Sequence, residues 1–547
     1  MFYFASMAYN MADLFEHSVD VIPDKTALIC GDETRTFAEL EARANRLAHH
    51  LSDAGIVPGN HVGLYAANSI EWIEAMLAIF KIRAVPININ YRYVENELRY
   101  LFDNADLVAL VYCEEFGPRV SAVIDEVPQL HHLVMIPDAS GATQDGLEPV
   151  AYADALASGS PERDFGARSN DDIVIIYTGG TTGMPKGVMW RTEDIFFALI
   201  GGTDPFTHER VASEFTHAEK AANAGGQLVF LNTPPLMHGA AFASSLMQFF
   251  QGNINVLVEK FDAHDVWRQV DRHRINSILI VGDAMGRPLI EALDEMETAG
   301  EELDLSCFIS LSSSAAVFSP TVKDRFLERF PNLILTDSIG ATESGFTGIR
   351  MVAKDDTAMK GGGPTVSPGA DTVVLDDELK IVEPGSSVIG RVARGGNIPI
   401  GYYKDEAKTA ATFVIGADGR RYSVPGDFAT VEEDGRITLM GRGSVCINTG
   451  GEKVFPEEVE SVLKAHPDVF DVIVVGAPDE RWGQRVSAIV EVRDGHDLDV
   501  DDLDRHARAH LAGYKVPRSV QTVDQVRRSP SGKPDYPWAL DLAANPR

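Results

Sequence analysis

The stretch that decides the fold reads Tyr177-Thr178-Gly179-Gly180-Thr181-Thr182-Gly183-Met184-Pro185-Lys186-Gly187-Val188. Directly before it, residues 171–176 end in apolar, β-branched side chains, which predicts a buried strand running into this loop. Glycine lets the backbone come close to a ligand, while successive N–H groups and threonine hydroxyls can converge on phosphate oxygens. Lysine adds a positive charge. The loop is therefore predicted to bind phosphate through Thr178, Gly179, Gly180, Thr181, Thr182, Gly183 and Lys186.

Two other interpretations of this loop have to be weighed. The first is an ordinary glycine-rich turn after a strand, which the interleaved threonines and the lysine make the weaker choice. The second is the phosphate loop of kinases and GTPases, which requires a Gly-Lys-Ser/Thr ending. Lys186 is followed by Gly187, so this second class is excluded. Another class of phosphate loop has to be considered.

The composition is that of a globular protein with more than one domain. The chain has 547 residues, of which 45% are hydrophobic and 24% charged. Its formal net charge of −33 argues against non-specific binding to nucleic acid and to anionic membranes. The sequence contains no apolar run long enough for a transmembrane helix and no basic leader, and its four cysteines are widely separated. We therefore expect a cytoplasmic protein without stable membrane insertion.

Strands and helices alternate in the first part of the chain. Between residues 10 and 112, apolar runs predicted as strands alternate with amphipathic helices, and one helix opens with a capping box at Thr36 and Glu39. This alternation predicts parallel βαβ units in doubly wound α/β layers. Residues 192–227 are expected to form a surface excursion. From residue 371 to 440 the predicted strands are short and separated by Gly, Pro and Asp, which favours a small β-barrel-like region.

Further motifs follow the loop along the chain. Small residues fill positions 312–316, and a histidine stands just beyond a predicted strand at His238. Taken singly, each motif has a plainer explanation, such as a structural histidine, a polar turn or an exposed lysine. The longer motifs are Asp337-Ser338-Ile339-Gly340-Ala341-Thr342-Glu343, Pro425-Gly426-Asp427, Gly441-Arg442-Gly443-Ser444, Gly450-Gly451 and Ser531-Gly532-Lys533.

Together, these motifs resemble those of the adenylate-forming superfamily, which comprises acyl-CoA synthetases, firefly-type luciferases and the adenylation domains of peptide synthetases. The resemblance covers nearly the whole chain, with the motifs in the family's order. It implies a large N-terminal domain over residues 1–442, built from two doubly wound α/β subdomains and a small β-barrel-like subdomain at about 371–440. A small, mobile α+β C-terminal domain is expected over residues 443–547.

The resemblance also implies roles for individual residues. Lys533 is expected to be the catalytic lysine, Thr342 to meet the α-phosphate, Glu343 to hold Mg²⁺ and His238 to lie beside the acyl pocket. The remaining nucleotide and CoA contacts are expected from Ser314, Ala315, Ala316, Asp337, Ser338, Ile339 and Gly340 around adenine, from Asp427 at the ribose hydroxyls, from Arg442 at the ribose or the α-phosphate, and from Gly450 and Gly451 along the CoA arm.

Three positions depart from the family pattern. Ile339 stands where a tyrosine is usual, which puts adenine stacking on that ring in doubt. Pro425 replaces a usual threonine. Ser444 stands at the predicted domain hinge, where Asp or Lys is usual, although a small residue can also absorb backbone rotation.

The function implied is that of an acyl-CoA synthetase that uses ATP, Mg²⁺ and CoA on a small-molecule carboxylic acid. The chain is most similar to actinobacterial synthetases that activate fatty acids or the carboxylated side chains of steroids, so a medium- or long-chain fatty acid or a steroid side-chain acid is expected. Two alternatives remain open: an enzyme that loads a separate carrier protein, and a non-catalytic nucleotide-binding sensor. The presence of both Glu343 and Lys533 counts against the sensor. No nucleic-acid partner is expected, and a homodimer is one option for the assembly state.

Overall fold

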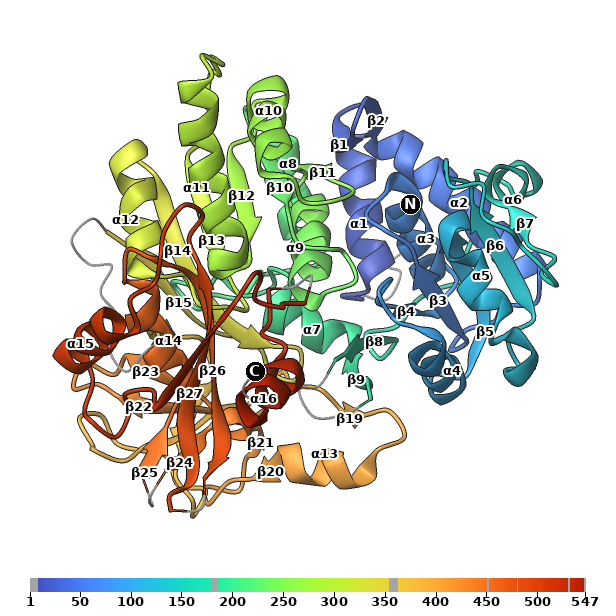
Figure 1. Ribbon diagram of the computed structural model, residues 1–547. Coiled ribbons are helices and arrows are strands. Elements are labelled where there is room, and N and C mark those ends of the chain that lie inside the picture. The colour runs from blue at the N-terminus through green and yellow to red at the C-terminus, as the bar shows by residue number, and fades with distance from the viewer. Residues whose placement is uncertain are drawn as a thin grey trace. The chain divides into compact units, whose positions relative to one another are not determined.

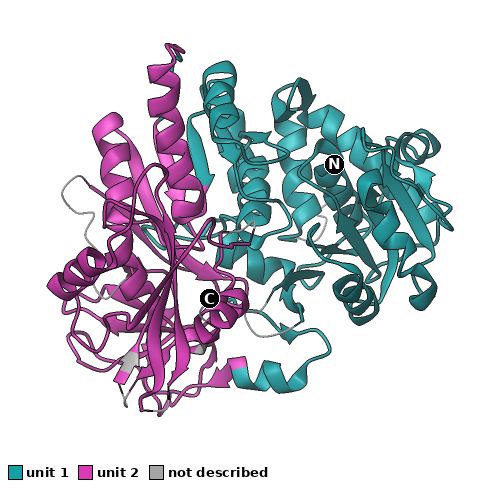
Figure 2. Cartoon of the chain, viewed as in Figure 1, with its two compact units in different colours: residues 1–279, 303–308, 397–411 teal, residues 280–302, 309–396, 412–547 magenta. Residues whose placement is uncertain are grey.

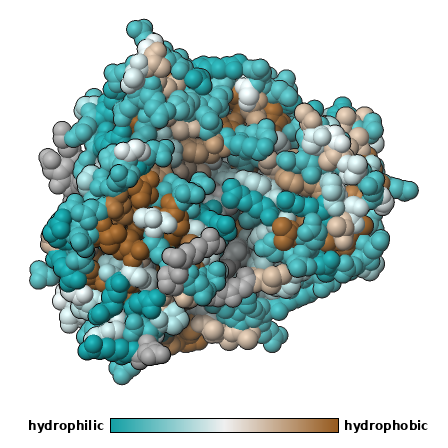
Figure 3. Space-filling view, in the orientation of Figure 1, coloured by the Kyte–Doolittle hydropathy of each residue, from teal (hydrophilic) through white to brown (hydrophobic). Residues whose placement is uncertain are grey.

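The computed structural model describes residues 8–179, 184–353, 363–449, 452–479, 481–529 and 532–545 (Figure 1). The chain forms two compact units (Figure 2): unit 1 comprises residues 1–279, 303–308 and 397–411, and unit 2 comprises residues 280–302, 309–396 and 412–547. The face visible in Figure 3 is mostly hydrophilic, in keeping with the 24% of charged residues. None of the helices in the described ranges combines the length and the apolar content of a membrane span.

An eight-stranded sheet forms one layer of unit 1, in the order β19-β9-β8-β4-β3-β5-β6-β7. The strands from β8 to β7 are parallel, while β9 and β19 join antiparallel at one edge. From β3 the chain passes to β4 on one side and then to β5 on the other, which confirms the expected doubly wound order. The strands are β3 (His61–Tyr65), β4 (Val85–Asn88), β5 (Leu107–Cys113), β6 (His132–Ile136), β7 (Val150–Ala151), β8 (Ile173–Thr178), β9 (Lys186–Arg191) and β19 (Gly401–Tyr402).

Amphipathic helices accompany this sheet in the sequence. They are α2 (Phe37–Asp53), α3 (Ile70–Lys81), α4 (Glu95–Asn104), α5 (Gly117–Ser121), α6 (Tyr152–Ser158) and α13 (Glu406–Thr412). The predicted capping box opens α2: Thr36 Oγ1 accepts from Glu39 N over 3.2 Å, and Glu39 Oε2 accepts from Thr36 N over 2.8 Å. Both groups satisfy backbone N–H donors that lack an intrahelical partner.

Unit 1 contains a second set of strands, in the order β2-β1-β11-β10-β12, of which all but β2 are parallel. Its elements are α1 (Met11–Val21), β1 (Thr26–Cys30), β2 (Glu33–Thr36), α7 (Thr192–Leu199), α8 (Thr216–Asn223), β10 (Val229–Asn232), α9 (Gly239–Phe250), β11 (Ile254–Leu257), α10 (Ala263–His273) and β12 (Ser277–Ile280). The expectation of a surface excursion over residues 192–227 was wrong for α7, because its apolar run over 195–198 is buried.

The first two strands of unit 2, β13 and β14, are parallel, and the strands that follow them in the same sheet are antiparallel. The antiparallel β-rich region expected over 371–440 is present, and its valines form a small core of their own. The elements are α11 (Gly282–Thr298), β13 (Ser310–Ser313), α12 (Pro320–Arg329), β14 (Ile334–Ala341), β15 (Gly345–Val352), β16 (Thr365–Pro368), β17 (Thr372–Leu375), β18 (Gly390–Arg394), β20 (Phe413–Ile415), β21 (Arg421–Ser423), β22 (Asp427–Val431) and β23 (Ile437–Arg442).

The C-terminal part of unit 2 has its own five-stranded sheet with helices on both faces (Figure 1). One face of β26 and β27 packs against α14 and α15, and the other packs against α16. The elements are β24 (Ile447–Thr449), β25 (Glu452–Val454), α14 (Pro456–Lys464), β26 (Val469–Asp479), β27 (Gly483–Val492), α15 (Val500–His510), β28 (Ser519–Val523) and α16 (Tyr536–Ala544). The expected domain boundary between residues 442 and 443 stays a prediction.

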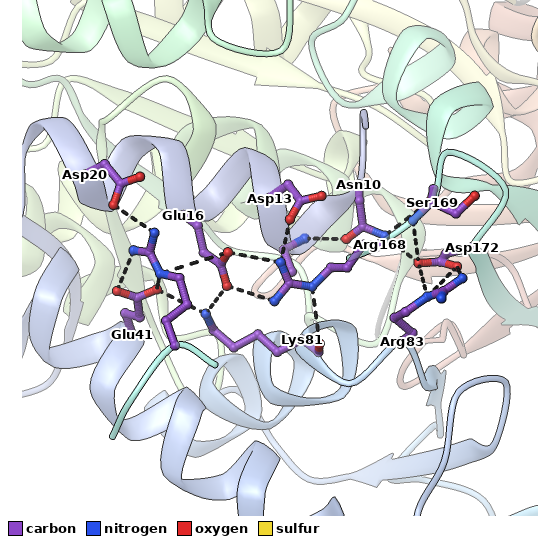
Figure 4. Close-up of polar contacts among 12 residues, drawn as sticks. Asn10, Asp13, Glu16, Asp20, Glu41, Lys81, Arg83, Arg168, Ser169 and Asp172 are labelled. Atoms are coloured by element: carbon purple, nitrogen blue, oxygen red, sulfur yellow. Dashed lines mark hydrogen bonds and ion pairs between the residues drawn. The ribbon is translucent and has the colours of Figure 1, made fainter. Parts of the chain in front are cut away.

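A buried ion cluster joins α1, α2 and α3 to the segment that precedes β8 (Figure 4). The Lys81 ammonium, at the end of α3, donates to Glu16 of α1 and, over 3.1 Å, to Glu41 of α2. From the segment between α6 and β8, Arg163 donates to Glu41 Oε1 over 2.7 Å and Arg168 donates to Glu16 Oε1 over 2.9 Å. Burial acts to raise the pKa of Glu16, but Lys81 and Arg168 outweigh it and hold that pKa below its ordinary value. The cluster thus fixes the segment from which β8 starts.

A carboxyl group with a buried oxygen lies at the start of α14. The side chain of Glu457 lies against Gly441, whose φ is +129°: a Cβ added to this glycine would lie 2.3 Å from Glu457 Oε2. Glu457 Oε1 accepts from Arg442 N over 3.5 Å, while Oε2 is buried and has no hydrogen-bond partner among the described residues. Burial, aided by nearby Glu460, raises the pKa of Glu457 to about 8. The carboxyl is therefore neutral in the folded protein at pH 7.

Lys81→Met should lower the free energy of unfolding by about 3 kcal/mol, because two buried carboxylates lose one of their partners. Urea unfolding at pH 7 measures this loss. Lys220→Met, at an exposed lysine of α8, is the control and should change stability by less than about 0.5 kcal/mol. Equal effects of the two substitutions would show that the cluster contributes no more than a surface lysine does.

Glu457→Gln should stabilise the protein at high pH by about 1–2 kcal/mol. Because the pKa is about 8 in the folded chain and 4.5 in the reference state, the folded protein holds an extra proton between these values. Its stability must then fall as the pH rises through this window, and glutamine removes that fall.

Calorimetric melting from pH 5 to pH 9 tests this expectation. The gain from Glu457→Gln should be smallest at pH 5 and complete near pH 9. The neighbouring variant Glu458→Gln, which breaks an ion pair with Lys515, should shift stability by a similar amount across this range. A pH-independent effect of Glu457→Gln would contradict the assignment of a buried neutral carboxyl.

Candidate active site

The phosphate loop starts at the carboxyl end of β8, beside β4, where open α/β sheets bind ligands. Asn88, at the end of β4, donates to Tyr177 O over 2.9 Å and accepts from Tyr177 N over 2.7 Å, so it fixes the strand end just before the loop. Thr178 is the last residue of β8, and Gly179 follows it. The predicted phosphate contacts Gly180, Thr181, Thr182 and Gly183 lie outside the described residues.

Lys186, on the far side of the loop, forms an ion pair with Asp405, which stands just before α13. Asp405 also accepts from Lys408 N over 2.8 Å. The hydrogen bond from Lys186 is the main reason that the pKa of Asp405 lies below its ordinary value. The sequence analysis missed Asp405, which lies three residues after β19, the strand that pairs with β9.

His238 lies at the N-terminus of α9, beyond the turn that follows β10. Its backbone N–H donates to Pro235 O over 3.0 Å, and its carbonyl accepts from Phe242 N over 3.0 Å. Gly239 and Ala240 beside it are partly exposed, whereas Ala241 and Ala243, two further small residues of α9, are buried in unit 1. A role for His238 beside an acyl pocket stays a prediction.

In unit 2, the small-residue loop follows β13 directly. Ser314 N donates to Ile280 O over 3.2 Å, and Ala316 N donates to Ser314 O over 2.9 Å. Between them, Ala315 has a φ of +66°, a left-handed conformation that costs energy for any residue with a Cβ. The tight turn leaves Ala315 exposed and its neighbours partly exposed, so backbone is accessible here for a flat ring.

The motif at residues 337–343 runs along β14 into the turn before β15. Asp337 is buried and forms an ion pair with the buried Lys323, although burial still raises its pKa. Ser338 Oγ donates to Ser313 O over 3.2 Å. Ile339 packs on the valine core of the β-rich region, so the residue that replaces the usual tyrosine has an apolar packing role. Gly340 is confined: an added Cβ would lie 2.5 Å from a backbone oxygen.

Four charged side chains from separate parts of unit 2 lie close enough to influence one another's pKa. Arg442 Nε donates to Asp427 Oδ1 over 3.0 Å, across the pair β22–β23. Lys533 lies near both of them and near Glu343, which follows Thr342 in the β14–β15 turn. Burial and then Arg442 lower the pKa of Lys533, while Glu343 and Asp427 raise it. Asp427, the closest opposite charge, raises the pKa of Arg442. Folding thus brings together residues that lie up to 190 positions apart in the sequence.

This charge set fits a magnesium nucleotide. Arg442 lowers the pKa of Lys533, so this pair of cations gains from a nearby anion, and phosphate oxygens accept strong hydrogen bonds from Lys and Arg. Within the described ranges, no cluster of three or more His, Cys, Asp or Glu could hold a metal alone. Mg²⁺ bound to a nucleotide needs only one or two carboxylates besides the phosphates. Glu343 is suited to that role.

The hinge motif is described only in part. Gly443, Ser444 and Val445 form a 3₁₀ turn directly after Arg442. Gly450 and Gly451, predicted to flank the CoA arm, lie outside the described residues. Besides Asp405, the sequence analysis missed Glu457, which lies in the first turn of α14.

Family models and curated relatives match most of this chain. The model of the family "AMP-binding enzyme" matches residues 15–403, and that of the "AMP-binding enzyme C-terminal domain" matches residues 458–533. A 3-oxocholest-4-en-26-oate–CoA ligase of Rhodococcus rhodochrous is 52% identical over 98% of this chain and 96% of its own length. A medium/long-chain-fatty-acid–CoA/3-oxocholest-4-en-26-oate–CoA ligase of Mycobacterium tuberculosis (strain ATCC 25618 / H37Rv) is 51% identical with the same coverage.

Solved structures share the fold. The anthranilate CoA ligase AuaEII, in complex with anthranoyl-AMP, superimposes with a TM-score of 0.82 at 22% identity over 98% of both chains. ATP-bound MatB from Rhodopseudomonas palustris gives a TM-score of 0.78 at 23% identity over 98% of this chain and 99% of its own. The α/β architecture with a large N-terminal and a small C-terminal domain is thereby confirmed. The chain therefore belongs to the AMP-binding enzyme family and is an AMP-forming acid–thiol ligase.

Proposed function

We propose that this enzyme is an acyl-CoA synthetase that converts a carboxylic acid and ATP into an acyl adenylate and pyrophosphate, and then transfers the acyl group to CoA. The observation that carries this proposal is the meeting of Lys533 with Glu343, Asp427 and Arg442. CoA ligases of this family use ATP, Mg²⁺ and CoA. The site has the charges that such a reaction needs, and its four charged side chains stay partly exposed to solvent.

The adenylation step needs positive charge because two anions must approach each other. A carboxylate attacks the α-phosphate, and Lys533 neutralises the charge that accumulates between them in the transition state. Glu343 would hold Mg²⁺, which would offset the charge of the phosphates when bound, and Thr342 contacts the α-phosphate. Arg442 uses only Oδ1 of Asp427, so the remaining lone pairs of this carboxylate are available to the ribose hydroxyls.

The pyrophosphate and CoA contacts rest on the family resemblance. We assign residues 178–186 to the departing pyrophosphate, with Lys186 released from Asp405 to meet it. For the second step, the C-terminal domain rotates about the hinge at Ser444, which removes Lys533 and lets CoA pass along residues 450–451. The thiol then attacks the acyl carbonyl, and AMP leaves.

For the substrate, we propose a steroid side-chain acid or a medium- to long-chain fatty acid. The relatives that match nearly the full length of this chain at 51–52% identity carry such acids in their names. The half-buried Gly239 and Ala240 beside His238 leave room where larger side chains would not. We also propose a cytoplasmic location and a homodimer as the assembly state, the latter to be checked by sedimentation equilibrium.

Pyrophosphate release from ATP and Mg²⁺ tests the function and its substrate together. The panel should contain 3-oxocholest-4-en-26-oic acid, fatty acids of increasing length and aromatic acids, each with and without CoA. We expect release with steroid or fatty acids, stimulated by CoA and accompanied by the acyl-CoA product. Tight ATP binding with no release for any acid would favour a nucleotide sensor, and adenylate formation without a CoA product would favour a carrier-loading enzyme.

Lys533→Ala should slow adenylation about 100-fold or more, since it removes a charge that stabilises the transition state. Thioester formation from supplied acyl adenylate and CoA should stay within about threefold of the wild type. Lys515→Ala is the control, because this lysine pairs with Glu458 and does not face Glu343. Retention of full adenylation by Lys533→Ala would refute the role assigned to this lysine.

A further inference from the structure

The loop that carries Lys533 is held as a hairpin. Arg528 and Pro534 pair across its base as an antiparallel bridge. Ser529 N donates to Lys533 O over 2.8 Å, and Lys533 N donates back to Ser529 Oγ over 3.1 Å. The backbone of the lysine is thus fixed to the opposite arm of the hairpin. What orients the hairpin itself is the guanidinium at its base.

The Arg528 guanidinium binds both the hairpin and the C-terminal sheet. Its Nε and Nη2 donate to the two oxygens of Asp471 on β26, over 2.6 and 2.8 Å, and Nη2 lies 3.3 Å from Val472 O. Its Nη1 donates to the carbonyl of Gly532 over 3.1 Å, immediately before Lys533. One planar group therefore connects the peptide next to the lysine with a buried strand, and Lys464 binds Asp471 from the other side over 3.0 Å.

The surroundings of this anchor strongly favour the ionised form of Asp471. Burial acts to raise the pKa of Asp471, but Lys464 and Arg528 outweigh it and hold the pKa well below its ordinary range. Both side chains of the Asp471–Arg528 pair are mostly buried. A bidentate pair of this kind resists rotation as well as separation, because the planar fork of arginine matches the carboxylate at two points.

Gly532 precedes Lys533 directly, so the restraints on this glycine determine where the lysine lies. Its φ of +70° is left-handed, and the residue lies against α11: an added Cβ would lie 2.9 Å from Val281 Cγ1 and 3.0 Å from Ala284 Cβ. The peptide that precedes Lys533 is therefore confined on one side by α11 and bonded on the other by Arg528. A flexible glycine with only one of these restraints would let the lysine shift.

We propose that Arg528 is a positioning residue for adenylation: tied to Asp471, it holds the Gly532 carbonyl so that the Lys533 ammonium stays directed at the carboxylate and α-phosphate. Arg528 touches neither substrate in this role. The inference rests on the proposed function of Lys533. Its physical basis is that a displacement of about 1 Å in a catalytic group can slow a reaction about 100-fold.

Separate measurement of the two half-reactions tests this inference. Arg528→Lys keeps the positive charge but loses the fork, so it cannot bind Asp471 at two points and the Gly532 carbonyl together. Adenylation, followed as pyrophosphate release in a single turnover, should slow about 10- to 100-fold. Thioester formation from supplied acyl adenylate should stay within about threefold, because Lys533 takes no part in it. A merely structural role would slow both half-reactions alike.

The matched control is Arg527→Lys. Arg527 is the adjacent residue on the same loop, but it is exposed and stacks over Trp538 instead of binding Asp471. This variant should retain both half-reactions within about twofold. Asp471→Asn removes the same anchor from the other side and should reproduce the selective loss of adenylation. It also provides the test if Arg528→Lys does not fold.

A double substitution separates this inference from the role of Lys533. In a Lys533→Ala background, Arg528→Lys should cause no further loss of adenylation, since no ammonium remains to be positioned. If Lys533→Ala alone has no effect, the proposed function of the lysine fails. Suppose instead that Lys533→Ala does slow adenylation. The positioning role is then wrong if Arg528→Lys and Asp471→Asn leave adenylation unchanged, or if they slow both half-reactions equally. It is also wrong if their effects add fully to that of Lys533→Ala.

Discussion

The repulsion between Lys533 and Arg442 is the constraint on which the site in unit 2 depends. Two cations that lie near each other keep their charge more readily when carboxylates lie close by, and Asp427 and Glu343 supply them. The same carboxylates can bind ribose hydroxyls and a magnesium ion. The arrangement is therefore stable without a ligand, yet an anionic ligand with its metal satisfies all four charges together.

Pairing of this kind matters more in an acidic protein. With a net charge of −33, an unpaired cation would attract many surface carboxylates and would point in no particular direction. Here Lys186 is directed by Asp405, and Arg442 by Asp427. Each partner orients its cation and also competes with phosphate for it. Binding of the nucleotide then exchanges one set of ion pairs for another, which limits the net gain in affinity but keeps the geometry defined.

Buried ion clusters serve a different purpose where no ligand is involved. Lys81 fastens the segment before the phosphate-loop strand, and Arg528 fastens the hairpin of Lys533. Each cluster joins an irregular segment, which has few backbone partners of its own, to regular helices or strands. Buried pairs add little stability compared with apolar packing, but they are strongly directional. Direction is what a loop that presents a catalytic group requires.

The sequence by itself determined the family, the order of the elements and most of the candidate site, because these depend on local patterns. Three motifs can be recognised in the sequence without knowledge of the fold. They are the glycine- and threonine-rich loop after a β-branched run, the capping box at Thr36 and the Gly532-Lys533 pair. The family resemblance that they support predicted an acid–thiol ligase, and the comparisons confirmed this prediction.

Tertiary structure decided what depends on contacts between distant segments. The roles of Asp405, Glu457 and the Asp471–Arg528 anchor were not predicted, since a carboxylate or a guanidinium acquires its role only from the partner that folding places beside it. The same holds for Ile339, whose packing on the β-rich core follows from a neighbouring sheet. Local sequence specifies which residues can do chemistry, whereas burial and long-range pairing set their charge and direction.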